Sequence, residues 1–309
     1  MSDQITIGVD IGGSHIISAA VNLKTLEIVP ETTFAVKVDN KAKKETVLKR
    51  WSEAINKTIS SASLKQHCSI GFAIPGPFNY KEGIALFEGG NDKYENLYGV
   101  SITEELPKYL ISDNIQFRFL NDATSFAVGV SAQGKAKNCE KILAVTLGTG
   151  FGSAFIKNGM PLISHSEVPK NGCLWDKTFK DGIGDDYFST RWFIKRYAEV
   201  SSKKVAGVKE IAQADTSDSK HVFKEFGSNM GQFMIPFLQK FNPDLIIMGG
   251  NIAHAGSLFI PSLQNVLVQA GLKIEVETSF LMEDAAIIGS AQLFNSEFWN
   301  QVQKDLPIR

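Results

Sequence analysis

The chain contains the sequence ITIGVDIGGSHIISAAV at Ile5–Val21, in which a glycine turn separates two stretches rich in β-branched residues. The same arrangement returns at Lys141–Lys157, which reads KILAVTLGTGFGSAFIK. Because glycine carries no Cβ atom, the backbone N–H groups of such a turn can surround an anion such as a phosphate. Either stretch alone is also compatible with an ordinary β-hairpin. The matched pair, with one copy in each half of the chain, predicts a nucleotide held between two related lobes.

The composition predicts a soluble globular protein of about two domains. The chain has 309 residues, 43% of them hydrophobic, and its 32 Lys and Arg against 33 Asp and Glu leave a net charge of −1. This balance does not favour binding to nucleic acid or to an anionic membrane, so a small polar substrate is the simpler expectation. The start MSDQITIGVD lacks the basic and apolar regions of a signal peptide, and no window offers the roughly 18 consecutive apolar residues of a membrane span. We therefore predict a cytoplasmic protein.

Motifs of several other function classes are missing from the sequence. Cys68, Cys139 and Cys173 are widely separated and form no CxxC pair, which predicts neither a disulfide framework nor a thiolate zinc site. We expect three buried free thiols. The glycines at Gly8-Gly12-Gly13 and Gly148-Gly150-Gly152 have the wrong spacing for a P-loop or a Rossmann motif.

Strands and helices alternate along the chain without a low-complexity linker, which predicts an α/β fold. After the first hairpin we expect a third strand near Leu26–Ala35. A helix follows, because apolar residues recur at three- and four-residue spacing from Val47 to Ile59. A buried strand at Ser69–Ile74 ends at Pro75-Gly76-Pro77, where the prolines cannot donate to a sheet. We expect a ligand near this rigid loop.

Asp10 lies just before the first glycine turn, which would set its carboxylate beside bound phosphates. Phosphate-bound Mg²⁺ usually takes one or two protein carboxylates and keeps several waters. Asp10 fits such a role through a water molecule. From the spacing alone, a turn aspartate that accepts hydrogen bonds from nearby backbone N–H groups is an equally good interpretation.

Asn121 and Asp122 stand where a predicted strand, Gln116–Leu120, passes into a helix. Both residue types are favoured at helix N-caps, and that role alone could explain them. One cap residue suffices, however, and ligands of α/β proteins bind outside the carboxyl ends of strands. Asp122 could therefore accept the proton of an attacking hydroxyl, a general-base role that contributes on the order of 10² to 10⁴ in rate.

Several motifs, taken in order, resemble the ROK (repressor, open reading frame, kinase) sugar kinases. The similarity covers nearly the whole chain, and the order and spacing of the motifs make it specific. The motifs are Asp10-Ile11-Gly12-Gly13-Ser14, Pro75-Gly76-Pro77, Asn121-Asp122-Ala123, Thr146-Leu147-Gly148-Thr149-Gly150-Phe151-Gly152, Gly249-Gly250-Asn251 and Asp284–Ala291. The last of them is similar to the final helix of that family.

The resemblance implies the fold shared by actin, Hsp70 chaperones and hexokinases, with two ribonuclease-H-like lobes around a central cleft. Residues 1–120 would form the smaller N-terminal lobe, joined by the C-terminal segment 295–309. Residues 121–294 would form the larger C-terminal lobe with the nucleotide-binding elements. ATP with Mg²⁺ and the sugar would meet between the lobes, and the family also allows a homodimer.

The resemblance further implies a role for each matched residue. Asp122 would deprotonate the sugar hydroxyl, and the sugar would be held by Asn121, Pro75 and Gly76. The residues that would serve the phosphates and the metal are Asp10, Gly12, Gly13, Ser14, Thr149 and Gly150, and those near the adenosine are Gly249, Gly250 and Asn251. Asn91, in the loop Gly89-Gly90-Asn91, is a further candidate for sugar contact.

The chain departs from the family in the segments for sugar and zinc. Most relatives carry a GExGH segment and then a CxCGxxGCLE zinc loop. Glu167 matches the Glu of the first segment, Lys170 stands where its His is expected, and Asp185 replaces the sugar-contacting Glu of the second. Without that His and the thiolates we expect no tetrahedral zinc site, as in the polyphosphate-glucokinase branch. The changed hydrogen-bonding groups leave the identity of the sugar open.

These observations predict an ATP- and Mg²⁺-dependent kinase that phosphorylates a hydroxyl, the one at C6, of a hexose or an N-acylated aminosugar. Two alternatives stay open: a sugar-responsive regulator without catalysis, and a kinase that takes its phosphoryl group from polyphosphate. Family repressors carry a helix-turn-helix ahead of the glycine turn. Only nine residues precede Asp10 here, so direct DNA binding is not expected.

Overall fold

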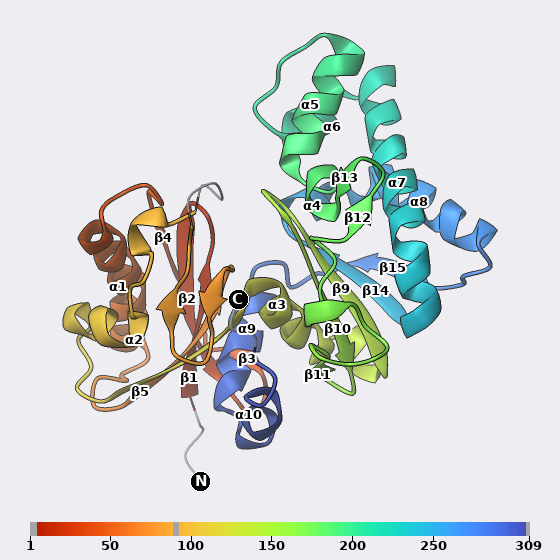
Figure 1. Ribbon diagram of the computed structural model, residues 1–309. Coiled ribbons are helices and arrows are strands. Elements are labelled where there is room, and N and C mark those ends of the chain that lie inside the picture. Colours follow the sequence, from red (N-terminus) through yellow and green to blue (C-terminus); the bar gives the residue numbers. More distant parts are fainter. Residues whose placement is uncertain (1–4, 89–92, 307–309) are drawn as a thin grey trace. The chain divides into compact units, whose positions relative to one another are not determined.

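The computed structural model describes residues 5–88 and 93–306. The chain forms two compact units: unit 1 comprises Met1–Ala132 and Glu283–Arg309, and unit 2 comprises Gln133–Met282 (Figure 1). This division differs from the one expected at residues 120 and 294, because helices α3 (Asp122–Ser131) and α9 (Asp284–Ala291) pack closely together within unit 1. Glycines permit that approach: a Cβ atom on Gly129 would lie 1.9 Å from the carbonyl oxygen of Ala285.

Unit 1 is built on a six-stranded sheet in the order β3-β2-β1-β5-β8, with β4 also paired to β2. Its strands are β1 Ile5–Ile11, β2 His15–Asn22, β3 Glu27–Ile28, β4 Phe34–Lys37, β5 Cys68–Ile74 and β8 Ile115–Asn121. β1 is antiparallel to β2 and parallel to β5, which is parallel to β8. The C-terminal ends of β1, β5 and β8 therefore share one edge of the sheet. The third strand expected at Leu26–Ala35 is instead two short strands, separated by Pro30 and by Glu31 in a left-handed conformation (φ 62°).

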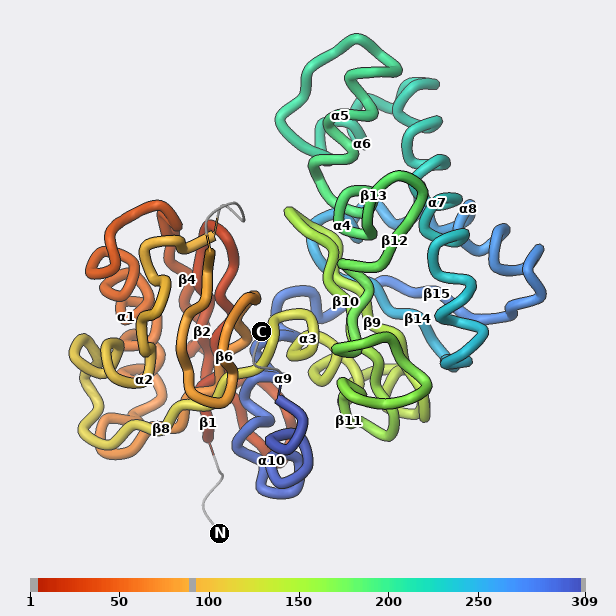
Figure 2. Tube along the Cα trace, viewed as in Figure 1, coloured from red at the N-terminus to blue at the C-terminus, as the bar shows by residue number. Residues whose placement is uncertain are grey.

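Helices cover both faces of this sheet, with α1 (Lys44–Ser61) on one side and α9 on the other (Figure 1). The predicted apolar stripe of α1 is buried, and Trp51 is its largest member. Gly8 in β1 and Gly71 in β5 let α9 approach the sheet, because Cβ atoms there would lie 2.1 Å and 1.9 Å from helix carbonyl oxygens. Figure 2 shows the C-terminal segment, in blue, returning to these first strands. The remaining elements of unit 1 are β6 Phe78–Asn79, β7 Ile84–Ala85, α2 Ile102–Glu105 and α10 Ser296–Val302, with 3₁₀ turns at Glu95–Leu97, Leu106–Tyr109 and Gln292–Phe294.

Unit 2 repeats the arrangement of the first sheet. Its five strands follow the order β11-β10-β9-β14-β15, and β9 is antiparallel to β10 and parallel to β14. The strands are β9 Lys141–Leu147, β10 Phe151–Lys157, β11 Met160–Pro161, β14 Leu245–Gly249 and β15 Glu275–Thr278, with a separate pair β12 Thr178–Phe179 and β13 Gly182–Ile183. The helices are α4 Gly184–Tyr187, α5 Thr190–Ser201, α6 Val208–Ala214, α7 Ser217–Phe241 and α8 Gly256–Gln269, with 3₁₀ turns at Lys135–Asn138, Lys170–Gly172 and Asn251–Ala255. The two similar sequences thus occupy the same place in two similar sheets.

The burial of the cysteines differs in part from the prediction. All three are free thiols; Cys68 is buried in β5, whereas Cys139 and Cys173 are only partly buried because they lie in loops of unit 2. Within residues 5–88 and 93–306, no helix combines the length and the apolar character that a membrane crossing requires.

Candidate functional site

The first glycine turn joins β1 to β2 and lies beside a buried tyrosine. The N–H of Gly12 donates to the carbonyl oxygen of His15 at 2.9 Å and closes the turn. The hydroxyl of Tyr94 donates to the carbonyl oxygen of Gly12 at 2.7 Å. Gly13 is half-buried and Ser14 is exposed. Tyr94 could not be predicted from the sequence, because this residue belongs to no motif and only the folded chain brings it to the turn.

Asp10 carries an unusually protonation-prone carboxyl group. Its pKa is raised to about 8, first because burial removes the carboxylate from water and then because the carboxylates of Asp122 and Glu283 repel it. A turn aspartate that accepts several backbone N–H bonds would have a lowered pKa instead. The raised value therefore does not fit that interpretation, and a nearby cation would favour the charged form of Asp10. A magnesium ion fits here, since it needs only one or two carboxylates beside phosphate oxygens and water.

Asn121 and Asp122 have different structural roles at the junction of β8 and α3. The side-chain oxygen of Asn121 accepts from the N–H of Thr124 at 3.2 Å, so Asn121 is the N-cap of the helix. The Oδ1 atom of Asp122 accepts from the N–H of Ala123 at 2.8 Å and from the Asn121 amide at 3.0 Å. Both bonds reach the same oxygen and hold the carboxylate in one orientation. Asp122 is thus not needed as the cap, which is consistent with the second interpretation of this pair.

The register of the parallel strands brings three predicted groups to one edge of unit 1. Asp10 in β1 pairs with Ala73 in β5, and Ile74 pairs with Asn121 in β8. Pro75 and Gly76 follow directly on β5 at the same edge; Pro75 is buried and Gly76 is half-buried. The Asn121 amide also donates to the hydroxyl of Tyr80 at 3.3 Å, which ties the end of β8 to the loop after β5. Ligands of α/β proteins bind outside the carboxyl ends of parallel strands, and β1, β5 and β8 place those ends at this edge.

The second glycine turn, between β9 and β10, is held by the start of α5. The N–H of Gly148 donates to the carbonyl oxygen of Gly150 at 3.0 Å, and Thr190 donates to the carbonyl oxygen of Gly148 through its N–H at 2.8 Å and its hydroxyl at 2.9 Å. Asp185 also contacts this turn, because its Oδ1 accepts from the N–H of Phe151 at 2.7 Å. Thr149 is exposed at the tip of the turn.

The segment Gly249-Gly250-Asn251 lies beside this second turn. Gly249 ends β14 and pairs with Thr146 in the parallel strand β9. Gly250 has a φ of 83°, and a Cβ atom there would lie 2.4 Å from the carbonyl oxygen of Leu147. Only glycine fits such a position. The second turn and this segment, predicted to serve the same nucleotide, therefore share one edge of unit 2.

Glu167 lies at the opposite end of the same hairpin. Its carboxylate pairs with Lys141 at 2.7 Å and Lys157 at 3.5 Å, which begin β9 and end β10. These contacts lower the pKa of Glu167, chiefly through the hydrogen bond from Lys141. The structure thus does not bring Glu167 together with Asp185 within unit 2. Lys170 is exposed at the start of a 3₁₀ turn, and Asn91 lies outside the described residues.

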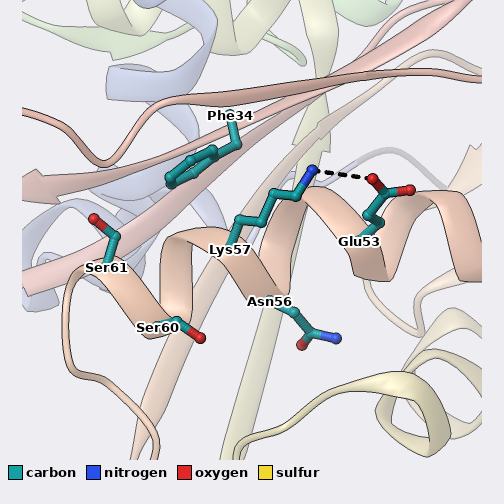
Figure 3. A pocket seen from close by; sticks show the side chains of 6 residues that line it. All are labelled: Phe34, Glu53, Asn56, Lys57, Ser60 and Ser61. Atoms are coloured by element: carbon teal, nitrogen blue, oxygen red, sulfur yellow. Dashed lines mark hydrogen bonds and ion pairs between the residues drawn. The ribbon is translucent and has the colours of Figure 1, made fainter.

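In the part of the chain that the structure describes, neither metal-ligating side chains nor the hollow on α1 forms a competing site. Among residues 5–88 and 93–306, no group of three or more His, Cys, Asp or Glu side chains is arranged to hold a metal ion. An open hollow on α1 and the edge strand β4 is lined by Phe34, Glu53, Asn56, Lys57, Ser60 and Ser61 (Figure 3). Glu53 and Lys57 pair with each other there at 3.0 Å. None of the lining residues is one that the sequence motifs single out.

Comparison with known proteins agrees with the motifs. Two relatives are the Glucokinase of Thermotoga maritima, 24% identical over 93% of this chain and 96% of its own, and an N-acetyl-D-glucosamine kinase of Histophilus somni, 24% identical over 94% and 98%. A Xylose repressor of Caldicellulosiruptor bescii is 22% identical over 94% of this chain and 78% of its own length. The structure of a ROK family glucokinase from Streptomyces griseus, in complex with glucose and AMPPNP, superposes with a TM-score of 0.71 at 20% identity, covering 94% of this chain and 99% of that one.

These comparisons confirm the predicted fold class of two related α/β lobes. They also agree with the predicted class of enzyme, because the names of most of these relatives are those of sugar kinases. The model of the ROK family matches residues 6–297. Since that match spans nearly the whole sequence, the chain belongs to the ROK family.

Proposed function

We propose that this chain transfers the terminal phosphoryl group of ATP to a hydroxyl, the one at C6, of a hexose or an N-acylated aminosugar. The observation that carries the proposal is the carboxylate of Asp122, held in one orientation at the edge of the sheet where Asp10 also lies. Membership of the ROK family and the kinases among its relatives support it.

In the proposed reaction, Asp122 is the general base. Its Oδ1 is occupied by the N–H of Ala123 and the amide of Asn121, so Oδ2 is the oxygen that would take the proton of the sugar hydroxyl. The hydroxyl oxygen forms a bond to the γ-phosphorus while the bond from that phosphorus to the bridging oxygen of ADP breaks. Positioning and charge stabilisation supply most of such a rate enhancement, and the base adds on the order of 10² to 10⁴.

Asp10 would hold the magnesium ion, through water, beside the phosphates. When bound, the ion would neutralise charge on the phosphate oxygens. Its presence would also offset the repulsion that Asp10 receives from Asp122 and Glu283. The N–H groups of Gly13 and Ser14 in the first glycine turn would add donors to the phosphates. Gly12 would allow the phosphates a close approach, since its own N–H already donates to His15.

Unit 2 would supply the remaining nucleotide contacts. Thr149 and Gly150 would bind phosphate oxygens through the second glycine turn, and the adenosine would lie near Gly249, Gly250 and Asn251. The second turn and this segment share one edge of the sheet, which supports a common ligand.

The sugar contacts belong to the same proposal. They would come from Asn121, Pro75, Gly76 and Asn91 and from Glu167 and Lys170, whereas both oxygens of Asp185 already bond to Phe151 and Arg191. Asn121 lies at the same edge of the sheet as Asp122, where its side chain is fixed as the cap of α3. We further propose that the enzyme works without zinc, in the cytoplasm, as a monomer or a homodimer.

An assay of ADP release across a panel of hexoses and N-acylated aminosugars tests the function. We expect ADP release that depends on both Mg²⁺ and one of these sugars, and no product from the matching 6-deoxy sugar. Polyphosphate replaces ATP in a parallel assay, because the donor is a separate part of the proposal. Tight binding of a sugar without any phosphorylation would instead support a non-catalytic regulator.

A further inference from the structure

Asp185 and Arg191 close a ring of hydrogen bonds around the second glycine turn. Arg191 donates through Nη1 to the carbonyl oxygen of Thr149 at 2.9 Å and through Nη2 to Oδ2 of Asp185 at 2.6 Å. The other oxygen of Asp185, Oδ1, accepts from the N–H of Phe151 at 2.7 Å. The two side chains thus form hydrogen bonds with the backbone of the turn on both sides of Gly150.

The ring depends on glycine at its centre. A Cβ atom on Gly150 would lie 2.9 Å from Oδ1 of Asp185, closer than such contacts normally allow. Glycine at this position therefore lets the carboxylate reach the neighbouring N–H of Phe151. The family resemblance implies that this glycine lets a phosphate approach the backbone. In the structure, it also leaves room for the carboxylate of Asp185.

Rigid elements on both sides anchor the ring. Asp185 belongs to α4, and its N–H donates to the carbonyl oxygen of Trp175 at 2.9 Å. Arg191 lies in the first turn of α5, next to Thr190, which is bonded to Gly148. Phe188, between the two helices, is fully buried. The ring is consequently part of the folded framework of unit 2 and not a pair of loose surface side chains.

The guanidinium group of Arg191 is only partly used by these contacts. A guanidinium carries five N–H donors, of which the ring takes one on each terminal nitrogen. The side chain of Arg191 is 60% exposed, against 26% for that of Asp185. The remaining donors thus face solvent next to the exposed residue Thr149. A planar guanidinium held in this way is well suited to phosphate oxygens.

We propose that Arg191 binds the phosphates of the nucleotide and that Asp185 positions it, together with the second glycine turn, for that contact. The proposal rests on the proposed kinase function and deepens it. It also gives Asp185 a different task from the sugar contact that the family resemblance implies. Asp185 then acts on the nucleotide through Arg191 and through the N–H of Phe151.

The test compares the affinities for nucleotide and sugar in single variants. Arg191→Gln should raise the KM for ATP about tenfold or more, since it removes a charge-assisted hydrogen bond, and should leave the KM for the sugar unchanged. Arg191→Lys should restore part of the affinity for ATP, because lysine keeps the positive charge but lacks the planar guanidinium group. Asp185→Asn should raise the KM for ATP by a smaller factor, again without an effect on the sugar.

Arg196→Gln is the matched control. Arg196 lies on the same helix but pairs with Glu225 at 2.8 Å and Glu199 at 3.1 Å, away from the turn. The control should leave the KM for ATP unchanged. If Asp185→Asn raises the KM for the sugar and not for ATP, or if Arg191→Gln leaves the KM for ATP unchanged, the proposal is wrong.

Direct binding separates this proposal from the proposed function. Calorimetric titration with ADP requires no turnover and should show the same loss in Arg191→Gln. If the wild-type chain binds ADP but phosphorylates no sugar, the kinase function fails while the titration still decides the role of Arg191. Thermal unfolding of each variant shows whether it is folded, and Arg191→Lys and Asp185→Asn keep the test valid should Arg191→Gln unfold.

Discussion

The two glycine turns are built on the same hairpin and differ mainly in charge. In the aligned copies Gly12 corresponds to Gly148, but Asp10 corresponds to the neutral Thr146. Beside the first turn, burial and then repulsion by neighbouring carboxylates raise the pKa of Asp10. The second turn is contacted by Arg191 of α5, whose charge is balanced by Asp185 and whose side chain remains exposed. These charges support the proposals of a cation at the first turn and of an anion at the second.

The hairpins also differ in the length of the turn and in the packing beneath it. Ile11 pairs with Ile16 around the first turn, whereas Leu147 pairs with Phe151 around the second, so the second turn is one residue shorter. Below the turn, Gly8 corresponds to Ala144. Unit 1 needs the glycine because α9 lies directly against the strand there. The two copies thus form similar sheets, whereas the elements that pack against the sheets differ between the units.

The charge of the first turn should dominate turnover. Asp10→Asn removes the carboxylate proposed to hold Mg²⁺, and a metal contact of this kind is worth several kcal/mol of transition-state stabilisation. We expect kcat to fall about a hundredfold or more, measured by ADP release at saturating sugar. Asp113→Asn, which changes an exposed aspartate of unit 1, is the control and should keep full activity. Equal rates for both variants would show that the charge at Asp10 is not used.

The packing difference should be visible in stability. Gly8→Ala places a Cβ atom 2.1 Å from the carbonyl oxygen of Ile287, where only a shift of α9 can make room. We expect the free energy of unfolding to fall by about 2 kcal/mol, a typical cost of overpacking. Ala144→Gly makes the reverse change in unit 2 and should cost only about 1 kcal/mol, through backbone entropy. Denaturant titration of both variants measures the difference, and equal losses would contradict the role given to Gly8.

The buried carboxyl group beside the first turn should also make the stability of the chain depend on pH. Asp10 has a pKa of about 8 in the folded chain against 3.8 as its ordinary value. Between these values the folded state keeps a proton that the unfolded state has released, so the free energy of unfolding falls as the pH rises. In the presence of a chelator, the wild type should lose on the order of 1 kcal/mol per pH unit relative to Asp10→Asn between pH 5 and 7. Parallel pH profiles for the two proteins would show that Asp10 is not buried among like charges.

Much of the fold and part of the site follow from local sequence. The two hairpins, the helix that contains Trp51 and the N-cap of α3 could be predicted because they depend on neighbouring residues and on residue periodicity. The parallel register of β1, β5 and β8 then brings Asp10 and Asp122 to one edge of the sheet.

The contacts that could not be predicted join distant segments. The bond from Tyr94 to Gly12 and the pairing of Glu167 with Lys141 depend on loops whose paths no periodicity reveals. Asp185 and Arg191 are close in sequence. Their bonds to the turn around Gly150 could not be predicted, because that turn lies elsewhere in the chain. The place of α9 in unit 1 likewise arises from glycine contacts with segments far away in the sequence.

The central claim is that Asp122 accepts the proton of the sugar hydroxyl. The most direct measurement compares sugar-dependent ADP release by the wild type and by Asp122→Asn, alongside calorimetric titration of both with ADP. We expect kcat to fall by a factor on the order of 10² to 10⁴, with the affinity for ADP preserved. An Asp122→Asn variant that retains the wild-type kcat would contradict it.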